Sequence, residues 1–205
     1  MLLFPYRSTY LSFEMIGRCP IPIQGFTMRF LLPLSVAVLV ASLPQFVSAQ
    51  SSDETDAAVV KKLAEQMTNA TQKGDYKKIV SLTYGSVVEQ LGGPTKAFET
   101  IKEQMETMKL RGMRMSQFKA GKLKGFASTA QNKFVIVPTQ LTLSLPGATI
   151  QADSFLLGIS SDLGKTWKFV DGAGIATQEQ QKKLLPPLPD DFQLPKPKQP
   201  KILRD

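Results

Sequence analysis

The sequence predicts an α+β fold in which helices come first along the chain and an antiparallel sheet follows. Between residues 57 and 108, apolar side chains recur at the three- and four-residue spacing of a helix. Between residues 134 and 171 they alternate with polar side chains, which is the period of a half-buried strand. A block of helices followed by a block of strands is typical of α+β proteins, not of the alternating βαβ pattern.

The first helix is predicted over residues 57–73, after a polar leader at residues 50–56. Ser52 or Asp53 in this leader could cap the amino end of the helix, and Gly74 is suited to ending it. The apolar stripe that predicts the helix consists of Ala57, Val60, Ala64, Met67 and Ala70.

Two further helices are predicted before the sheet. Asp75 can cap the second helix, which kinks at Tyr84-Gly85 and stops at Gly92-Gly93. Pro94 suits the first turn of the third helix, because its fixed φ fits a helix and its missing amide proton is not needed there. The apolar residues of this third helix are Ala97, Phe98, Ile101, Met105 and Met108.

The longest strands are predicted over residues 134–145 and 149–160. Pro146-Gly147 between them predicts a reversal, so the two strands should pair as a hairpin. Pro138 cannot donate a ladder hydrogen bond, which indicates a bulge or a position whose amide would face outward. A third strand is predicted over residues 166–171. We expect one inward face to carry Val135, Val137, Thr139, Leu141, Phe155, Leu157, Trp167 and Phe169.

Two weaker strands are predicted near residues 113–118 and 123–128, with Gly121 or Gly125 at a bulge or bend. This region has many cations and no acidic residue, and the Pro-rich tail at residues 185–205 adds more. Such a surface would attract anionic glycans, lipid headgroups or nucleic acid. Because aromatic residues do not interleave with the cations, the pattern disfavours nucleic acid and favours a solvated basic face. The cations are Lys109, Arg111, Arg114, Lys119, Lys122, Lys124, Lys196, Lys198, Lys201 and Arg204.

The segment between the second and third strands has the spacing S-x-D-x-G-x-T-W, from Ser160 to Trp167. It resembles the Asp-box hairpin of sialidases and other propeller proteins. The resemblance implies that Asp162 and Gly164 shape the turn and that Trp167 packs beneath it. A propeller would repeat the motif at intervals of roughly 40 to 50 residues, and it occurs once here, so we interpret it as turn chemistry and not as glycosidase activity.

An export signal is predicted at residues 28–49. Met28-Arg29 precedes an apolar run that is shorter than a transmembrane helix requires. Val47-Ser48-Ala49 then provides the small residues that a signal peptidase recognises, so cleavage is predicted after Ala49. Residues 1–27 are interpreted as an over-extended start, with a long amino-terminal region or a membrane anchor as the alternative. The predicted mature protein is periplasmic or extracellular, with a folded domain at residues 57–174 and a polar helix and basic tail at residues 175–205.

The chain has no histidine, and its one cysteine, Cys19, precedes the predicted cleavage site. The commonest general base near neutral pH and the commonest zinc ligand are therefore missing. Disulfides and thiolate metal sites are also excluded from the mature chain. No cofactor or metal site is predicted, and these absences favour binding over catalysis.

The segment from about Val59 to Gly172 resembles the nuclear transport factor 2-like superfamily. The residues that carry the resemblance are Gly74-Asp75-Tyr76, the run from Leu82 to Gly93, and the run from Ser160 to Gly172. It is similar to small exported bacterial members of that group. The resemblance implies a cystatin-like cone, in which helices pack on a curved antiparallel sheet around a pocket, and dimerisation through the sheet. Members act as enzymes, binders or accessory domains, so the fold alone assigns no function.

Three functions follow from this reading. The first is binding, either of a small apolar ligand in the pocket or of an anionic envelope component on the basic face. The second is catalysis of the ketosteroid-isomerase type, with Asp153 as the base and Tyr76 or Tyr84 as the hydrogen-bond donor. The third is a structural module whose cone is filled by side chains. The candidate ligand-binding residues are Tyr76, Tyr84, Thr139, Asp153, Phe155 and Trp167.

Overall fold

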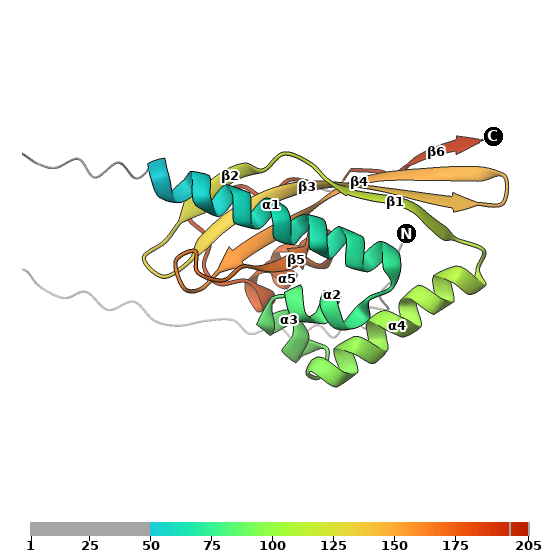
Figure 1. Cartoon of the computed structure of the whole chain (residues 1–205), viewed down its shortest axis with the longest axis horizontal. Coiled ribbons are helices and arrows are strands. Elements are labelled where there is room, and N and C mark those ends of the chain that lie inside the picture. The colour runs from blue at the N-terminus through green and yellow to red at the C-terminus, as the bar shows by residue number, and fades with distance from the viewer. Residues whose placement is uncertain (1–49, 197, 205) are drawn as a thin grey trace, which may run out of the picture. The chain divides into compact units, whose positions relative to one another are not determined.

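The computed structural model describes residues 50–196 and 198–204, and side chains are described from residue 54 onward, except at residues 197 and 204. The predicted start at residues 1–27 and the export signal at residues 28–49 lie outside the described residues. The fold is α+β, with helices packed against a strongly curled antiparallel sheet (Figure 1). Its elements are α1 (Gln50–Lys73), α2 (Tyr76–Leu82), α3 (Gly85–Gln90), α4 (Pro94–Leu110), β1 (Arg114–Ala120), β2 (Lys124–Ser128), β3 (Lys133–Leu145), β4 (Ala148–Ser160), β5 (Lys168–Asp171), the 3-10 helix η1 (Gly172–Ile175), α5 (Gln178–Leu184) and β6 (Lys201–Arg204).

The sheet has the strand order β1-β3-β4-β5, with β2 paired to β3 beyond the end of β1 and β6 paired to β4. The predicted hairpin is confirmed, because β3 and β4 pair along their whole length. The register shift at Gly125 in β2 confirms the predicted bulge, and a second shift, between Met115 and Gln117 in β1, was not predicted. Strands β1 and β2 therefore continue each other along one edge of β3, with a break at residues 121–123.

Pro138 lies opposite this break. Its carbonyl oxygen accepts a hydrogen bond of 2.7 Å from the backbone N–H of Gly121. In a strand, the nitrogen and the carbonyl of one residue point to the same side, so the nitrogen of Pro138 faces the gap between β1 and β2. Proline is tolerated in this central strand because the break leaves no strand on that side to which a backbone N–H at position 138 would have to donate.

The helix boundaries agree with the capping signals, apart from the start of α1. Gly74 has a φ of 71° at the end of α1, and the carboxylate of Asp75 accepts a 3.1 Å hydrogen bond from the backbone N–H of Lys78. Gly93 precedes Pro94, which begins α4. Helix α1 starts at Gln50, so residues 50–56, predicted as a leader, form its first turns.

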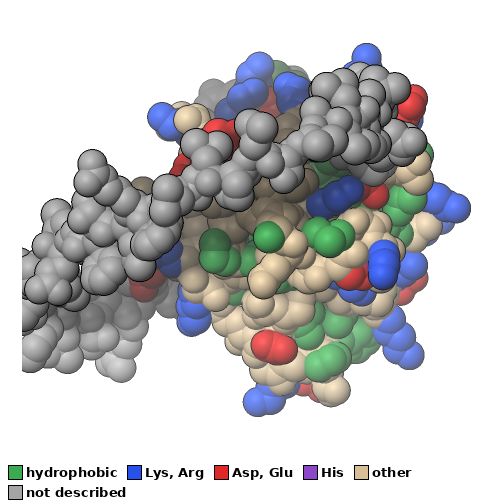
Figure 2. All heavy atoms as spheres, turned by 90° about the vertical axis from the view of Figure 1, so that its left-hand side faces the viewer, with side chains coloured by type: hydrophobic (Ala, Val, Ile, Leu, Met, Phe, Trp, Pro, Cys, Tyr) green, Lys and Arg blue, Asp and Glu red, His purple; other side chains and the backbone are tan. Residues whose placement is uncertain are grey.

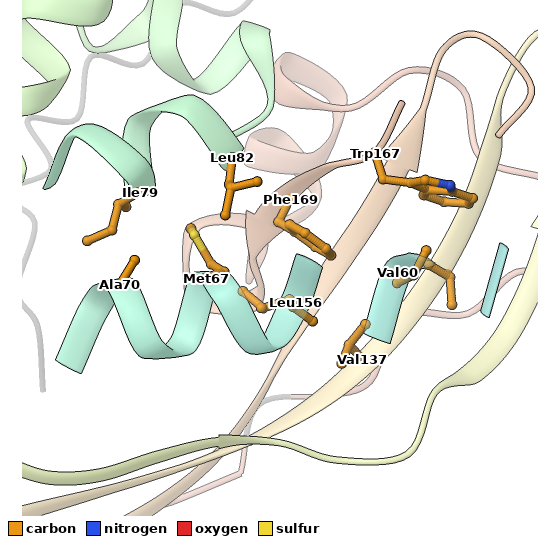
Figure 3. Packing of buried hydrophobic residues seen from close by; sticks show 11 residues of the cluster. Val60, Met67, Ala70, Ile79, Leu82, Val137, Leu156, Trp167 and Phe169 are labelled. Atoms are coloured by element: carbon orange, nitrogen blue, oxygen red, sulfur yellow. The ribbon is translucent and has the colours of Figure 1, made fainter. Parts of the chain in front are cut away.

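One face of the sheet, called the helix face below, packs against α1 and α2. Figure 3 shows side chains from these helices and from three strands pointing toward one another. The space expected to form the pocket of a cone is filled here by a continuous core. Its buried residues are Val60, Ala64, Met67, Ala70, Ile79, Leu82, Val135, Val137, Leu156, Trp167 and Phe169.

The expectation of a single inward face was wrong for β4. In the observed register, Ile136 pairs with Leu157 and Pro138 pairs with Phe155. Phe155 and Leu157 therefore lie on the face opposite to Val135, since paired residues point to the same side of a sheet. The two hairpin strands are out of phase by one residue relative to the prediction, and residues 134–137 and 155–160 are buried on both faces.

The second face, called the tail face, is covered by η1, α5 and the Pro-rich tail. The tail has too little apolar content to fold alone, and its apolar side chains pack against the second core. Its last described residues form β6, which pairs with β4. The buried part of this core is Phe134, Ile136, Phe155, Leu157, Ile159, Val170, Ile175 and Leu184, and the side chains packed on it include Leu185, Leu188, Phe192 and Leu194.

The turn between β4 and β5 has the geometry that the Asp-box resemblance implies. The carboxylate of Asp162 accepts hydrogen bonds from the backbone N–H and the hydroxyl of Thr166, at 2.8 and 2.7 Å, and one from the hydroxyl of Ser160 at 2.7 Å. These bonds, first among them the one from the Thr166 backbone, lower the pKa of Asp162 from 3.8 to about 2. Trp167 is 2% exposed beneath the turn, so the motif is a structural one.

Candidate functional site: a basic groove on the tail face

A groove of about 940 Å³ lies on the tail face, between the middle of the sheet, η1 and the tail. Its size is within the range of sites that hold small organic molecules. It is lined by residues 119–121, 124 and 125 from the β1–β2 edge, 136 and 138–140 from β3, 152–155 from β4, and 172, 173, 176, 195, 196 and 198 from the segments that follow the sheet.

The floor of the groove is apolar. Ile136 and Phe155 are 6% and 5% exposed, and Pro138 lies beside Phe155 in the paired strands. Gly172 in η1 approaches the aromatic ring closely, because a Cβ atom at this position would lie 2.5 Å from the nearest ring carbon of Phe155. Only glycine allows η1 to close this side of the groove over the ring.

The rim of the groove is basic. Lys119 and Lys124 come from the two strands that flank the break opposite Pro138, and Lys196 and Lys198 come from the tail. Alternation along β1 places Lys119 opposite Gln140, on the tail face. All four lysine residues are exposed, so their ammonium groups are hydrated, and those of Lys119, Lys124 and Lys196 can reorient toward a ligand.

Asp153 is the one acidic residue in the lining. Its carboxylate lies 3.5 Å from the ammonium of Lys198 and accepts a 3.3 Å hydrogen bond from the side-chain amide of Gln140. The side chains of Lys198 and Asp153 are 73% and 45% exposed, so the ion pair is weak, in the range of about 0–1 kcal/mol. It joins the tail to β4 without neutralising the other three lysines of the rim.

The candidate residues fall into separate places. Asp153 and Phe155 lie on the tail face and line the groove, whereas Thr139 borders the groove with its side chain on the helix face, in phase with Val135 and Val137. Tyr76 packs on the helix-face core, edge-to-face against Phe98 with ring centroids 6.0 Å apart, whereas Tyr84 packs on the tail-face core. Trp167 is buried on the helix face, where its indole N–H has no hydrogen-bond partner within the described residues.

The arrangement expected of a ketosteroid-isomerase-type base is not formed. Such a base would lie in an apolar cavity with a donor opposite it. Asp153 instead lies at an exposed rim, with Gln140 and Lys198 as its partners. Neither Tyr76 nor Tyr84 lines the groove. The geometry around Asp153 is that of a surface ion pair.

The groove was not predicted from the sequence, because the strands were expected to be buried on one face only and no packing of the tail against the sheet was expected. Two features of the sequence indicate instead that the strands are buried on both faces and that the tail packs on the domain. Phe134–Val137 and Phe155–Leu157 are continuous apolar runs, which is the pattern of strands buried on both faces. The first ten residues of the tail contain four large apolar residues, Leu185, Leu188, Phe192 and Leu194, which pack against the tail-face core.

A second crevice of about 790 Å³ lies among α2, α3 and the start of α4. Its lining mixes Lys77 and Lys168 with Glu89 and with apolar side chains. The ammonium of Lys168 already donates a hydrogen bond to the backbone carbonyl of Ser81. This crevice has less uncompensated charge than the groove, so we regard the groove as the better candidate site.

Within the described residues, no three of the acidic and thiol side chains gather as a metal site would require. None of the helices in that part of the chain combines the length and the apolar content needed to cross a membrane. No protein-family model matches the chain, and no curated protein matches it. The geometry of the groove is therefore the basis for assigning a function.

Proposed function

We propose that this protein is a binding protein, and that its tail-face groove holds a small amphipathic anion such as a fatty acid. The proposed function is binding without catalysis. It combines the two kinds of ligand that the sequence suggests, a small apolar molecule and an anionic envelope component, in one site.

The observation that carries the proposal is the combination of four lysines and one aspartate around an apolar floor. An apolar chain would lie on Ile136, Pro138 and Phe155, where it displaces water from carbon surface at about 25 cal/mol per Å². The negative headgroup would lie at the rim, where Lys119 and Lys124 attract it. A neutral ligand would gain only the free energy of apolar contact with the floor, and a cationic headgroup would be repelled by the lysine rim.

The packing of helices on a curled sheet supports assignment to the nuclear transport factor 2-like superfamily, which we likewise propose. We also propose export to the periplasm or the exterior, on the signal-like run at residues 28–49. An exported binder of amphipathic anions would meet its ligands at the cell envelope.

Native mass spectrometry tests the proposed function. The protein is purified from its own host and measured before and after denaturation. We expect a small mass that is lost on denaturation and carries a carboxylate, phosphate or sulfonate together with an apolar chain. A co-purifying cation, or a neutral polar molecule, would refute the proposed ligand class.

A headgroup comparison provides the control when the ligand is lost in purification. Dodecanoate, dodecanol and dodecylammonium share one chain length and differ in charge. We expect calorimetric titration of the purified protein to give the tightest binding with dodecanoate and the weakest with dodecylammonium. Equal binding of all three would show that the lysine rim does not select the ligand.

A further inference from the structure

Exposed apolar side chains gather at one end of the domain. This end, called the distal end below, consists of the last turn of α4, the start of β1, the β3–β4 turn and β6, and it lies at the right of Figure 1. Among the described side chains, it contains three of the five large hydrophobic residues that are exposed: Leu110, Ile202 and Leu203, at 89%, 65% and 48%. Water-exposed leucine and isoleucine in one place mark an interaction surface more often than isolated ones do.

The paired strands place Ile202 at the end of an apolar row, whereas Leu203, the next residue of β6, points to the opposite face of the sheet. In register, Ile202 of β6 pairs with Ile150 of β4, and Ile150 pairs with Leu143 of β3. Leu143 pairs in turn with Met115 of β1. The four residues form an apolar row across the sheet, in which Met115, Leu143 and Ile150 are half-buried and Ile202 is the most exposed.

Leu110 lies at the same end, because the residues that follow it contact the β3–β4 turn. A Cβ atom at Gly112 would lie 3.5 Å from the ring of Pro146 in the β3–β4 turn. The end of α4 therefore packs next to the hairpin turn, two residues after Leu110. The exposed leucine and the apolar row belong to one end of the domain and not to two distant surfaces.

Apart from Glu106 and Asp205, which border it, the distal end carries charges of one sign. Residues 107–118, 141–151 and 199–204, none of which lines the groove, contain no acidic side chain, and Glu106, Asp153 and Asp205 lie just beyond them. The exposed cations there include Lys109 and Arg111 on either side of Leu110, Arg114 at the start of β1, and Lys201 beside Ile202. At the opposite end of the domain, which Figure 2 shows, Lys and Arg side chains are interspersed with Asp and Glu.

We propose that the distal end docks on the surface of an anionic lipid bilayer. Its exposed apolar side chains would enter the boundary between headgroups and acyl chains, and its cations would pair with anionic headgroups. Nucleic acid or an acidic glycan would satisfy the cations but leave Leu110 and Ile202 without a partner. This interaction uses no residue of the groove lining, so it does not depend on the proposed ligand.

Depth-dependent fluorescence quenching tests the inference on the full chain. Cys19 is replaced by Ser, Leu110 by Cys, and the new thiol is labelled with bimane. The matched control carries the label at Leu163→Cys, because Leu163 is 55% exposed in the β4–β5 turn, outside the distal end. The vesicles contain phosphatidylcholine, with or without phosphatidylglycerol, and lipids brominated on the acyl chain as quenchers.

We expect strong quenching of the label at position 110 on vesicles that contain phosphatidylglycerol, and little quenching at position 163. This comparison reports which end touches the lipid, even if residues 28–49 also bind the membrane. Equal quenching at both positions, or none at position 110, would overturn the proposal.

Charge reversal gives a second test. Each basic side chain near an anionic surface contributes about a five-fold factor to binding, so Arg111→Glu with Arg114→Glu should lower the vesicle partition coefficient at least about 25-fold. The control is Lys182→Glu with Lys183→Glu in α5, which changes the net charge equally at another exposed place. An equal loss in both pairs would mean that only net charge matters, and would also overturn the proposal.

Discussion

The carboxylate of Asp56 in α1 lies 2.6 Å from the ammonium of Lys133 at the start of β3. The two side chains are only 11% and 15% exposed, and 77 positions separate them in the sequence. The same carboxylate lies against the β4–β5 turn, because a Cβ atom at Gly164 would be 2.7 Å from its nearer oxygen. One ion pair thus connects the first helix, the central hairpin and the Asp-box-like turn.

Replacing Lys133 by Met should destabilise the protein by about 3 kcal/mol. The change leaves the Asp56 carboxylate largely buried without its counter-ion, and an unpaired buried charge costs several kcal/mol. Urea unfolding followed by tryptophan fluorescence measures the effect, since Trp167 is the single tryptophan and is buried. The control is Lys102→Met, whose pair with Glu106 is half exposed at 3.8 Å and should contribute less than about 0.5 kcal/mol. Equal losses in the two variants would contradict this account.

Acid should weaken the β4–β5 turn in a defined pH range. Because the pKa of Asp162 is lowered from 3.8 to about 2 in the folded state, its charged form stabilises the fold above about pH 4. This contribution is lost as the pH falls from about 4 to about 2, where the carboxylate becomes protonated in the folded protein too. The difference in unfolding midpoint between the wild type and Asp162→Asn should therefore be largest at pH 5 and shrink toward pH 2. A difference that does not change with pH would refute the role of this charge.

Adding one methyl group at Gly172 should damage the groove. In Gly172→Ala the new Cβ atom would meet the ring of Phe155, so the ring must shift or η1 must move. We expect a loss of about 1–3 kcal/mol in unfolding free energy and weaker binding of dodecanoate. Gly174→Ala is the matched control, because nothing lies within 4 Å of a Cβ atom there. If both variants bind and unfold like the wild type, the close contact between η1 and the floor is not important.

The tail should contribute to stability through Phe192. Its ring lies 5.9 Å from that of Phe134, centroid to centroid, and packs against the tail-face core. Because Phe192 is half-buried, Phe192→Ala should cost about 2 kcal/mol, less than the truncation of a fully buried aromatic residue. Thermal unfolding measures the change, with Leu110→Ala as a control that removes an exposed side chain. An unchanged melting temperature for Phe192→Ala would indicate that the tail does not support the sheet.

Local chemistry made most of the elements predictable. The boundaries at Gly74, Asp75, Gly93 and Pro94 follow from capping and φ preferences that act within a few residues. The hairpin turn at Gly147, with a φ of 75°, has the same kind of local cause. The start of α1 at Gln50 was missed because the polar leader shows no apolar period.

The site could not be predicted, because it depends on long-range packing. The phase between β3 and β4 is fixed by pairing, and a shift of one residue moves Phe155 and Asp153 to the other face. The groove also needs the tail, which returns to β4 about 50 residues later along the chain. The basic residues were recognised from the sequence, but only the fold brings Lys119 and Lys196 to one rim.

Calorimetric titration with dodecanoate, below its micelle-forming concentration, can decide whether the lysine rim binds the headgroup. The wild type is compared with the double variant Lys119→Met, Lys124→Met. Because each exposed charge pair contributes up to about 1 kcal/mol, the double variant should bind dodecanoate about ten-fold more weakly and dodecanol unchanged. Lys182→Met with Lys183→Met, in α5, should bind both like the wild type. No binding of dodecanoate to the wild type, or equal binding to all three proteins, would contradict the account.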